Sequence, residues 1–209
     1  MKKIIVTYLA ISFLLVTCIN SNENQYAAVW TEDDKAYLIA HLEESFNSVM
    51  DLIQDVDEQQ WNWQPDSNVW SVALVVEHLI VHDELFYREV NVLTALPEMT
   101  ALGVDQFSDD ESILSYREIT PQNTGNAPSY LAPLGRWCSK EDALRGYSRI
   151  RKALINFVAN NDNNLRNYYT KSGRGPTAYR DLHQLLLISV AHTERHLKQI
   201  KSIMDRTES

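Results

Sequence analysis

Cysteine is scarce in this chain of 209 residues, which contains only Cys18 and Cys138. If Cys18 belongs to an N-terminal targeting segment, Cys138 has no partner elsewhere in the chain. The cysteine pattern then excludes both a disulfide framework and a thiolate metal site. We expect Cys138 to serve packing rather than chemistry.

Glycine and proline are also sparse, with six of each, and they gather in the middle of the chain. This composition disfavours a fold of many short strands and favours long, uninterrupted helices. The length suits one domain that buries its core without disulfides. No internal repeat or low-complexity tract is visible, so we predict a single all-α domain.

Positive charge is in deficit, because the formal net charge is −9 and becomes −11 if a leader carrying Lys2 and Lys3 is removed. Such an acidic surface repels phosphate backbones, so we expect no nucleic-acid partner. The expected partner is a small molecule of unknown identity. A homodimer is compatible with the sequence.

The N-terminal apolar run, residues 4–16, is shorter than the roughly 20 residues that a bilayer-spanning helix needs. Because Lys2 and Lys3 precede it, the run is typical of a secretory signal. It ends in Leu15-Val16-Thr17-Cys18, which resembles a bacterial lipoprotein box, although Thr17 stands where that motif usually has Gly, Ala or Ser.

Cys18 is therefore a candidate lipidation site, and residues 1–18 form a predicted signal or lipoprotein segment. A signal peptide cleaved nearby and an uncleaved anchor are the alternatives. In each case we expect an extracytoplasmic domain, secreted or lipid-anchored to the bacterial envelope, that meets the membrane only through this segment. Residues 19–30 are rich in Asn and Ser, as in a linker.

The domain is predicted to span residues 31–206 and to begin with a helix that follows Thr31 and ends near residues 54–57. Acidic residues fill its first turn, where they suit the helix dipole. Apolar residues then recur at helical spacing. They are Leu38, Leu42, Phe46, Val49, Ile53 and Val56.

Three further helices are predicted over residues 72–96, from residue 139 to about 160, and over residues 177–204. Ser71 and Ser139 are the expected N-caps of the second and third helices. The connection over residues 97–138 holds most of the Gly and Pro, and we expect only short helical turns there, covering one end of the bundle. A four-helix bundle with a long crossover loop between its second and third helices follows.

His192 and His196 lie four residues apart on the apolar stripe of the last predicted helix, so their side chains project about 40° from one another. Two surface histidines are the alternative interpretation. A buried imidazole, however, needs a partner, and a metal ion supplies one. A third ligand must come from another helix, where spacing alone leaves both His78 and His82 open.

Other polar and aromatic residues receive less specific roles. Glu194 lies about 200° around the helix from His192, so we expect it to face solvent and reject a zincin-type peptidase. His41 is expected to serve ordinary packing or to lie at a boundary position rather than to bind a metal, and His183, opposite His192, to face solvent. Aromatic residues near the first interhelix turn either anchor the loop or line a pocket, and anchoring is the more common role. They are Trp61, Trp63, Trp70 and Tyr87.

Two motifs carry a family resemblance. Trp70-Ser71-Val72-Ala73 with Glu77-His78-Leu79, and the stretch from His192 to Ile200, resemble the DinB-like superfamily of bacterial metal-binding four-helix bundles. The resemblance covers residues 31–204. It implies that His78, His192 and His196 bind one divalent metal ion, and that His82 supports these ligands or faces the substrate. Imidazole ligands suit zinc, nickel and iron, as well as copper.

Three neutral imidazoles leave a coordination position open, as in catalytic sites. The superfamily includes thiol-dependent S-transferases and hydrolases, so the resemblance implies a divalent-metal-dependent enzyme. The export signal places the domain outside the reducing compartment, which favours a hydrolase. No catalytic residue beyond the ligands is identified. A non-catalytic metal-binding envelope module is the alternative, and an open cleft bordered by the loop over residues 97–137 would favour catalysis.

Overall fold

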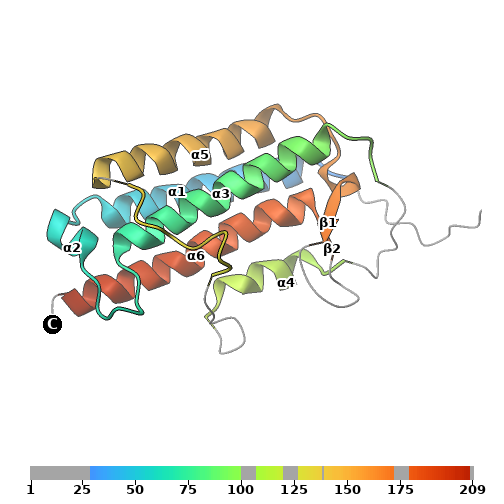
Figure 1. Cartoon of the computed structure of the whole chain (residues 1–209). Coiled ribbons are helices and arrows are strands. Elements are labelled where there is room, and N and C mark those ends of the chain that lie inside the picture. The colour runs from blue at the N-terminus through green and yellow to red at the C-terminus, as the bar shows by residue number, and fades with distance from the viewer. Residues whose placement is uncertain (1–28, 100–106, 120–126, 138, 172–178, 208–209) are drawn as a thin grey trace, which may run out of the picture.

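Four long helices lie side by side in the computed structural model (Figure 1). They are α1 (Glu32–Ile53), α3 (Val72–Thr94), α5 (Lys140–Asn160) and α6 (Leu182–Thr207). Both α1 and α3 pack against α5 and α6, so α1 faces α3 across the core. The predicted all-α four-helix bundle is confirmed.

The structure describes residues 29–99, 107–119, 127–137, 139–171 and 179–207. The expectations for the segment 1–18, including Cys18, and for Cys138 fall outside these residues, as does nearly all of the predicted linker. Within the described ranges, no helix combines the length and the apolar composition of a membrane-spanning segment.

Side chains at the predicted N-caps satisfy backbone N–H groups that would otherwise lack a partner. Thr31, Ser71 and Ser139 each accept a hydrogen bond from the backbone N–H three residues later, at 3.1 to 3.3 Å. These helix starts are confirmed. The last helix differs, because α6 begins at Leu182 rather than near residue 177.

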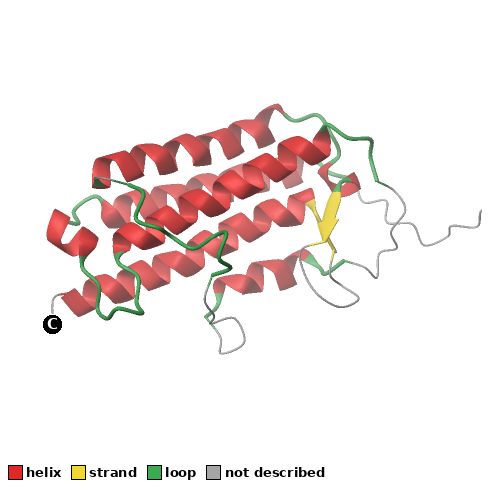
Figure 2. Cartoon of the chain, in the orientation of Figure 1, coloured by secondary structure: helices red, strands yellow, loops and turns green. Residues whose placement is uncertain are grey.

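The difference at α6 arises from a short hairpin that the sequence did not predict. Strands β1 (Tyr169–Lys171) and β2 (Tyr179–Asp181) pair antiparallel, and β2 runs directly into α6 (Figure 2). A 3₁₀ turn, η3 (Leu165–Asn167), precedes β1. Three-residue strands are too short to show an alternating pattern, so periodicity could not reveal them.

The crossover between α3 and α5 contains α4 (Asp110–Leu114) and the 3₁₀ turn η2 (Ser115–Arg117). Both pack against α6, so the crossover covers a side of the bundle and not only one end (Figure 1). Ile113 and Leu114 explain this position, because both side chains are buried in the core. Another short helix, α2 (Glu58–Asn62), joins α1 to α3.

The core is divided into two apolar clusters by a layer of buried polar side chains. Leu42, Leu154 and Leu186 belong to one cluster, while Val49 and Ile200 belong to the other. The polar side chains come from all four long helices, between the members of the two clusters. They are Ser45, His78, His82, Asp83, Arg151, Ser189, His192, Thr193 and His196.

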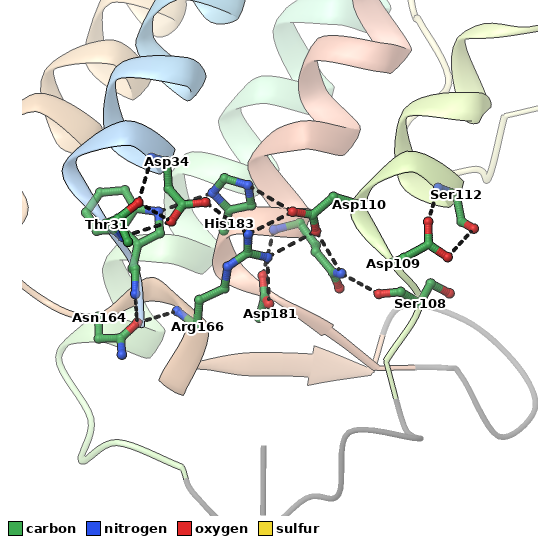
Figure 3. A network of polar contacts seen from close by, with 12 residues as sticks. Thr31, Asp34, Ser108, Asp109, Asp110, Ser112, Asn164, Arg166, Asp181 and His183 are labelled. Atoms are coloured by element: carbon green, nitrogen blue, oxygen red, sulfur yellow. Dashed lines mark hydrogen bonds and ion pairs between the residues drawn. The ribbon is translucent and has the colours of Figure 1, made fainter. Parts of the chain in front are cut away.

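A network of charged groups closes the hairpin end of the bundle (Figure 3). Arg166 forms ion pairs with Asp34 at 3.2 Å, Asp110 at 2.7 Å and Asp181 at 3.1 Å. These carboxylates belong to α1, α4 and β2. One guanidinium therefore ties together segments that lie far apart in the sequence.

His183 lies beside this network, and the expectation that it faces solvent is wrong. The residue is 2% exposed, its Nδ1 accepts a hydrogen bond from Nε1 of Trp30 at 3.1 Å, and its Nε2 lies 3.5 Å from Asp110. Trp30 and α4 cover the face of α6 opposite His192. The helical wheel located that face correctly but could not show what packs against it.

Gly146 of α5 allows the indole ring of Trp137 to pack directly on the helix. A Cβ atom at position 146 would lie 2.7 Å from Cζ2 of Trp137 and closer still to Cη2. In an exposed helix interior, Gly→Ala stabilises by about 1 kcal/mol. Here we predict that Gly146→Ala lowers the free energy of unfolding by about 1 to 3 kcal/mol, measured by urea denaturation, because of overpacking.

The matched control is the same substitution in a Trp137→Ala background, where the obstacle is gone. There, Gly146→Ala should be neutral or stabilising. Stabilisation by Gly146→Ala in the otherwise unchanged chain would contradict the packing described.

Candidate functional site

Three histidines converge in the polar layer. His78 comes from α3, whereas His192 and His196 come from successive turns of α6. Nε2 of His192 lies 3.0 Å from Nε2 of His78 and 3.1 Å from Nε2 of His196. All three side chains are buried, and their donor atoms lie within 4.8 Å of one another.

The outer nitrogens of two of these rings have acceptor partners. Nδ1 of His78 lies 2.8 Å from the carbonyl oxygen of Leu131, and Nδ1 of His196 lies 2.7 Å from Oε1 of Gln199. Since these oxygens only accept, each Nδ1 carries the proton and each Nε2 presents a lone pair. Nε2 of His192 has at most one proton to donate, so it cannot form a hydrogen bond to both of the other Nε2 atoms. At least two nitrogen lone pairs therefore face one another at close range.

A shared cation relieves this crowding. With metal–nitrogen distances of about 2.0 to 2.2 Å, two imidazole ligands lie roughly 2.9 to 3.5 Å apart for the usual coordination angles. The separations of 3.0 and 3.1 Å fall in this range. The donor set therefore fits one divalent metal ion bound through Nε2 atoms.

The charge state of the rings also suits metal binding. Burial lowers the pKa of His78, and burial with the neighbouring imidazoles lowers the pKa of His196 to about 3. The pKa of His192 is lowered well below its ordinary value, again mainly by burial. The rings are neutral at physiological pH, so protons compete little for the nitrogen lone pairs.

Glu77, immediately before His78, anchors the crossover segment that contacts the site. Its two carboxylate oxygens accept hydrogen bonds from the backbone N–H groups of Leu134, Gly135 and Arg136, at 2.8 to 3.1 Å. Nε of Arg136 adds a fourth bond at 2.7 Å. Burial opposes ionisation, but these donors hold the pKa of Glu77 below its ordinary value.

This anchor determines where Leu131 lies. Gly135 adopts a φ of 71°, a left-handed conformation that favours glycine, and so lets consecutive N–H groups turn toward the carboxylate. Leu131 precedes Leu134 by three residues, and its carbonyl oxygen is the acceptor for Nδ1 of His78. Glu77 therefore helps to orient the ring of His78 through the backbone of the crossover.

A buried ion pair lies next to the histidines in the polar layer. Arg151 of α5 is fully buried and lies 3.0 Å from Asp83 of α3. Ser189 donates a hydrogen bond to Asp83 at 2.7 Å, and Arg151 donates to Thr193 at 2.6 Å. This network joins three helices at the level of the histidines, so it fixes how α3 and α6 are placed relative to one another.

The three histidines line a cavity of about 1520 Å³. Its wall includes Tyr116 of η2 and Leu131 of the crossover. Trp70 also lines it, with its ring 5.0 Å from that of His78 and 6.4 Å from that of His196. The histidine cluster therefore opens into a cleft bordered by the crossover.

The family model of the DinB superfamily matches residues 41–200 of the sequence, and this range includes all three histidines. The chain belongs to the DinB superfamily. The predicted resemblance is thereby confirmed.

A solved structure supports the fold of this DinB-superfamily chain. YfiT from Bacillus subtilis, described as a probable metal-dependent hydrolase with an unusual four-helix bundle topology, aligns with a TM-score of 0.57 and 14% identity. The alignment covers 87% of this chain and 92% of that one. No curated protein matches the sequence.

Among the histidines of this DinB-superfamily domain, His82 does not join the converging group. Its ring stacks on that of His192, with centroids 3.8 Å apart and an angle of 11° between the planes, and it lines the cavity. His41 lies outside the site, with its ring 4.2 Å from that of Tyr37 and its side chain 33% exposed.

Glu194 points away from the histidines, but it is not simply solvent-facing. Its side chain is 29% exposed and lies 3.7 Å from Arg117 of η2, because the crossover covers this side of α6 in part. Trp61 is buried as a packing anchor, and Trp70 both packs against the same apolar cluster and lines the cavity. Trp63 and Tyr87 pack against this cluster as well, so all of the aromatic positions take part in packing and Trp70 also borders the cavity.

Several residues of the site were not assigned from the sequence. Gln199 lies three residues after His196, a spacing that places both on one helix face. Glu77 is an acid beside a candidate ligand on a mostly apolar helix, a signal that could have marked it as buried. The contact of Leu131 with His78 has no local signal, since it is made by a backbone carbonyl.

The geometry predicts that His192→Ala abolishes stoichiometric metal binding, because the central donor of the cluster is lost. Removal of one of three ligands should weaken binding by at least about 100-fold. The measurement is elemental analysis after dialysis against a divalent metal ion. His41→Ala is the matched control and should keep its metal, and equal metal contents in the two variants would contradict the assignment.

Proposed function

We propose that this chain is a metal-dependent hydrolase that acts on a small molecule. The observation that carries the proposal is the position of the three histidines, which are themselves buried yet line a large cleft. A purely structural metal site is normally closed by four protein ligands. The description of YfiT as a probable metal-dependent hydrolase supports the same reaction class.

When bound, the ion supplies Lewis acidity, which polarises a scissile carbonyl or phosphoryl group and makes water nucleophilic near neutral pH. The protein residues perform the remaining tasks. His78 and His196 are oriented by Leu131 and Gln199, respectively. The ring of Trp70 forms an apolar wall beside them, so it restricts the approach of bulk water.

Two considerations favour hydrolysis over its alternatives: the size of the cleft and the proposed export of the domain. A non-catalytic module needs no cavity of about 1520 Å³ beside its metal site. A thiol-dependent S-transferase needs a small cytosolic thiol, which an exported domain does not meet. Hydrolysis requires only water as the second reactant, and so agrees with an extracytoplasmic location.

The test uses the chain loaded with zinc, nickel, iron or manganese and a panel of chromogenic esters, amides and phosphoesters. We expect turnover of at least one class that depends on the ion and falls at least about 100-fold in His192→Ala. His41→Ala should keep its rate within about twofold. Absence of metal-dependent turnover on every class, or consumption of an added thiol with formation of an S-conjugate, would count against hydrolysis.

We also propose that the domain is exported and anchored through Cys18, on the basis of Lys2, Lys3 and the apolar run that ends at Cys18. Mass spectrometry of membrane-extracted protein should show an N-terminal lipidated cysteine. In Cys18→Ala, the protein should leave the membrane fraction. A mature N-terminus at another residue would refute lipidation but would leave the metal site unaffected.

A further inference from the structure

The cleft is elongated, and the histidines lie between its two ends. Its α6 wall extends from Leu185 to Arg206, which is about 30 Å at a rise of about 1.5 Å per residue. His192 and His196 lie near the middle of this wall. A molecule bound at the histidines can therefore extend along the cleft in two directions.

The two long walls of the cleft, α3 and α6, run antiparallel. His78 of α3 contacts His192 of α6, and further along α3 Asp83 accepts a hydrogen bond from Ser189, an earlier residue of α6. The later residues of α3 thus lie opposite the earlier residues of α6, on the side of the histidines that leads to the β1–β2 hairpin (Figure 1). We call this part of the cleft the hairpin arm.

The hairpin arm is apolar next to the histidines. Its described lining there comes from α3, from α4 of the crossover and from α6, so three elements contribute to one apolar surface. The residues are Leu85, Phe86, Ile113, Leu185 and Ile188. Such side chains can contact an apolar group but offer it no hydrogen bond, so they favour hydrocarbon over polar substituents.

Aromatic rings connect the hairpin arm to the metal site. The ring of His82 stacks on that of His192, with centroids 3.8 Å apart, and its centroid lies 4.2 Å from that of Phe86. All three residues line the cleft. An apolar chain attached to a group at the histidines can therefore pass over a continuous surface into the arm.

Part of this apolar surface remains open to the cleft. Leu85 and Ile188 pack against the apolar cluster of the core, but both side chains are only partly buried. Apolar side chains that line a cleft are typical of a ligand site, because a ligand that covers them removes their surface from water.

Charged residues limit the length of the apolar part. Glu89 of α3, Lys171 of β1 and Arg180 of β2 line the cleft beyond it, on the side away from the histidines. Between His192 and Leu185 the axis of α6 advances by about 10 Å. This length suits an alkyl chain of medium length.

In the opposite direction the lining of the cleft is more polar. Asn68 of the loop before α3 and Gln199 and Ser202 of α6 lie there, together with Trp70 and Ile203. Amide and hydroxyl groups can form hydrogen bonds with a polar substituent. The two directions therefore suit the two ends of an amphipathic molecule.

We propose that the substrate is an amphipathic ester or amide whose apolar chain, of medium length, occupies the hairpin arm. This inference deepens the proposed function and rests on it for the words ester and amide. The binding of the chain depends only on the lining of the arm. Leu85 on the α3 wall and Ile188 on the α6 wall are then residues that select the chain.

The experiment measures binding and not turnover, so its outcome does not depend on hydrolysis. Isothermal titration calorimetry on the zinc-loaded full chain compares octanohydroxamate with acetohydroxamate. Both carry the same zinc-binding group, so the ratio of their affinities reports the alkyl chain alone. We expect octanohydroxamate to bind at least about tenfold more tightly, because buried methylene groups add to the free energy of binding.

Ile188→Asn should lower this ratio of affinities at least about threefold, because it replaces apolar surface of the arm with an amide. Acetohydroxamate is too short to reach the arm, so its affinity should change by less than about twofold. Leu85→Asn tests the α3 wall in the same way and serves as the second variant if Ile188→Asn does not fold.

Ile155→Asn is the matched control. Like Ile188, Ile155 is a partly buried isoleucine that packs against the same apolar cluster, but it lies on α5 outside the cleft lining. The ratio of affinities should stay within about twofold of that of the unchanged chain. Elemental analysis must show the same zinc content in each variant.

Each contrary result has a definite meaning. Equal affinities for the two hydroxamates, or no detectable binding of octanohydroxamate at millimolar concentration to a chain of confirmed zinc content, would overturn the proposal. A ratio that survives both Ile188→Asn and Leu85→Asn, or that falls equally in Ile155→Asn, would also overturn it. A hydrolase screen without turnover would leave the preference for the longer chain standing and would count only against the proposed reaction.

Discussion

The constraint on which this structure depends is the crowding of imidazole lone pairs at one buried point. Two outer nitrogens are committed to carbonyl and amide oxygens, so their inner nitrogens face His192 at 3.0 and 3.1 Å without enough protons to share. In a water-filled site such groups would be solvated. In this buried layer a shared cation would satisfy them, so the polar layer of the bundle suggests a metal site.

Holding such a layer inside a four-helix bundle requires support from every side. The two apolar clusters on either side of the polar layer supply the packing. The ion pair of Arg151 and Asp83 joins α5 to α3 at the level of the histidines. A buried ion pair is weak evidence for stability, because desolvation offsets much of its attraction. Its effect here is to set one arrangement of α3, α5 and α6, which places His78 opposite His192.

The crossover contributes more to the site than a connection between two helices requires. Its backbone orients His78 through Leu131, and Glu77 anchors it. Its 3₁₀ turn supplies Tyr116, whose ring is stacked with that of His192 at 6.3 Å between centroids. The bundle shared with YfiT at 14% identity indicates the fold alone, whereas the proposed hydrolysis would depend on the cleft that this segment borders.

The sequence by itself determined the features that depend on local periodicity: the four helices, their N-caps at Thr31, Ser71 and Ser139, and the placement of His192 and His196 on one face. The family motifs indicated the choice of His78 over His82, which spacing had left open. Tertiary structure alone decided the burial of His183, the hairpin before α6 and the anchoring of Leu134 by Glu77. These features arise where segments distant in sequence cover a helix face. Helical periodicity shows which way a side chain points, but the partner that packs against it depends on how the whole chain folds.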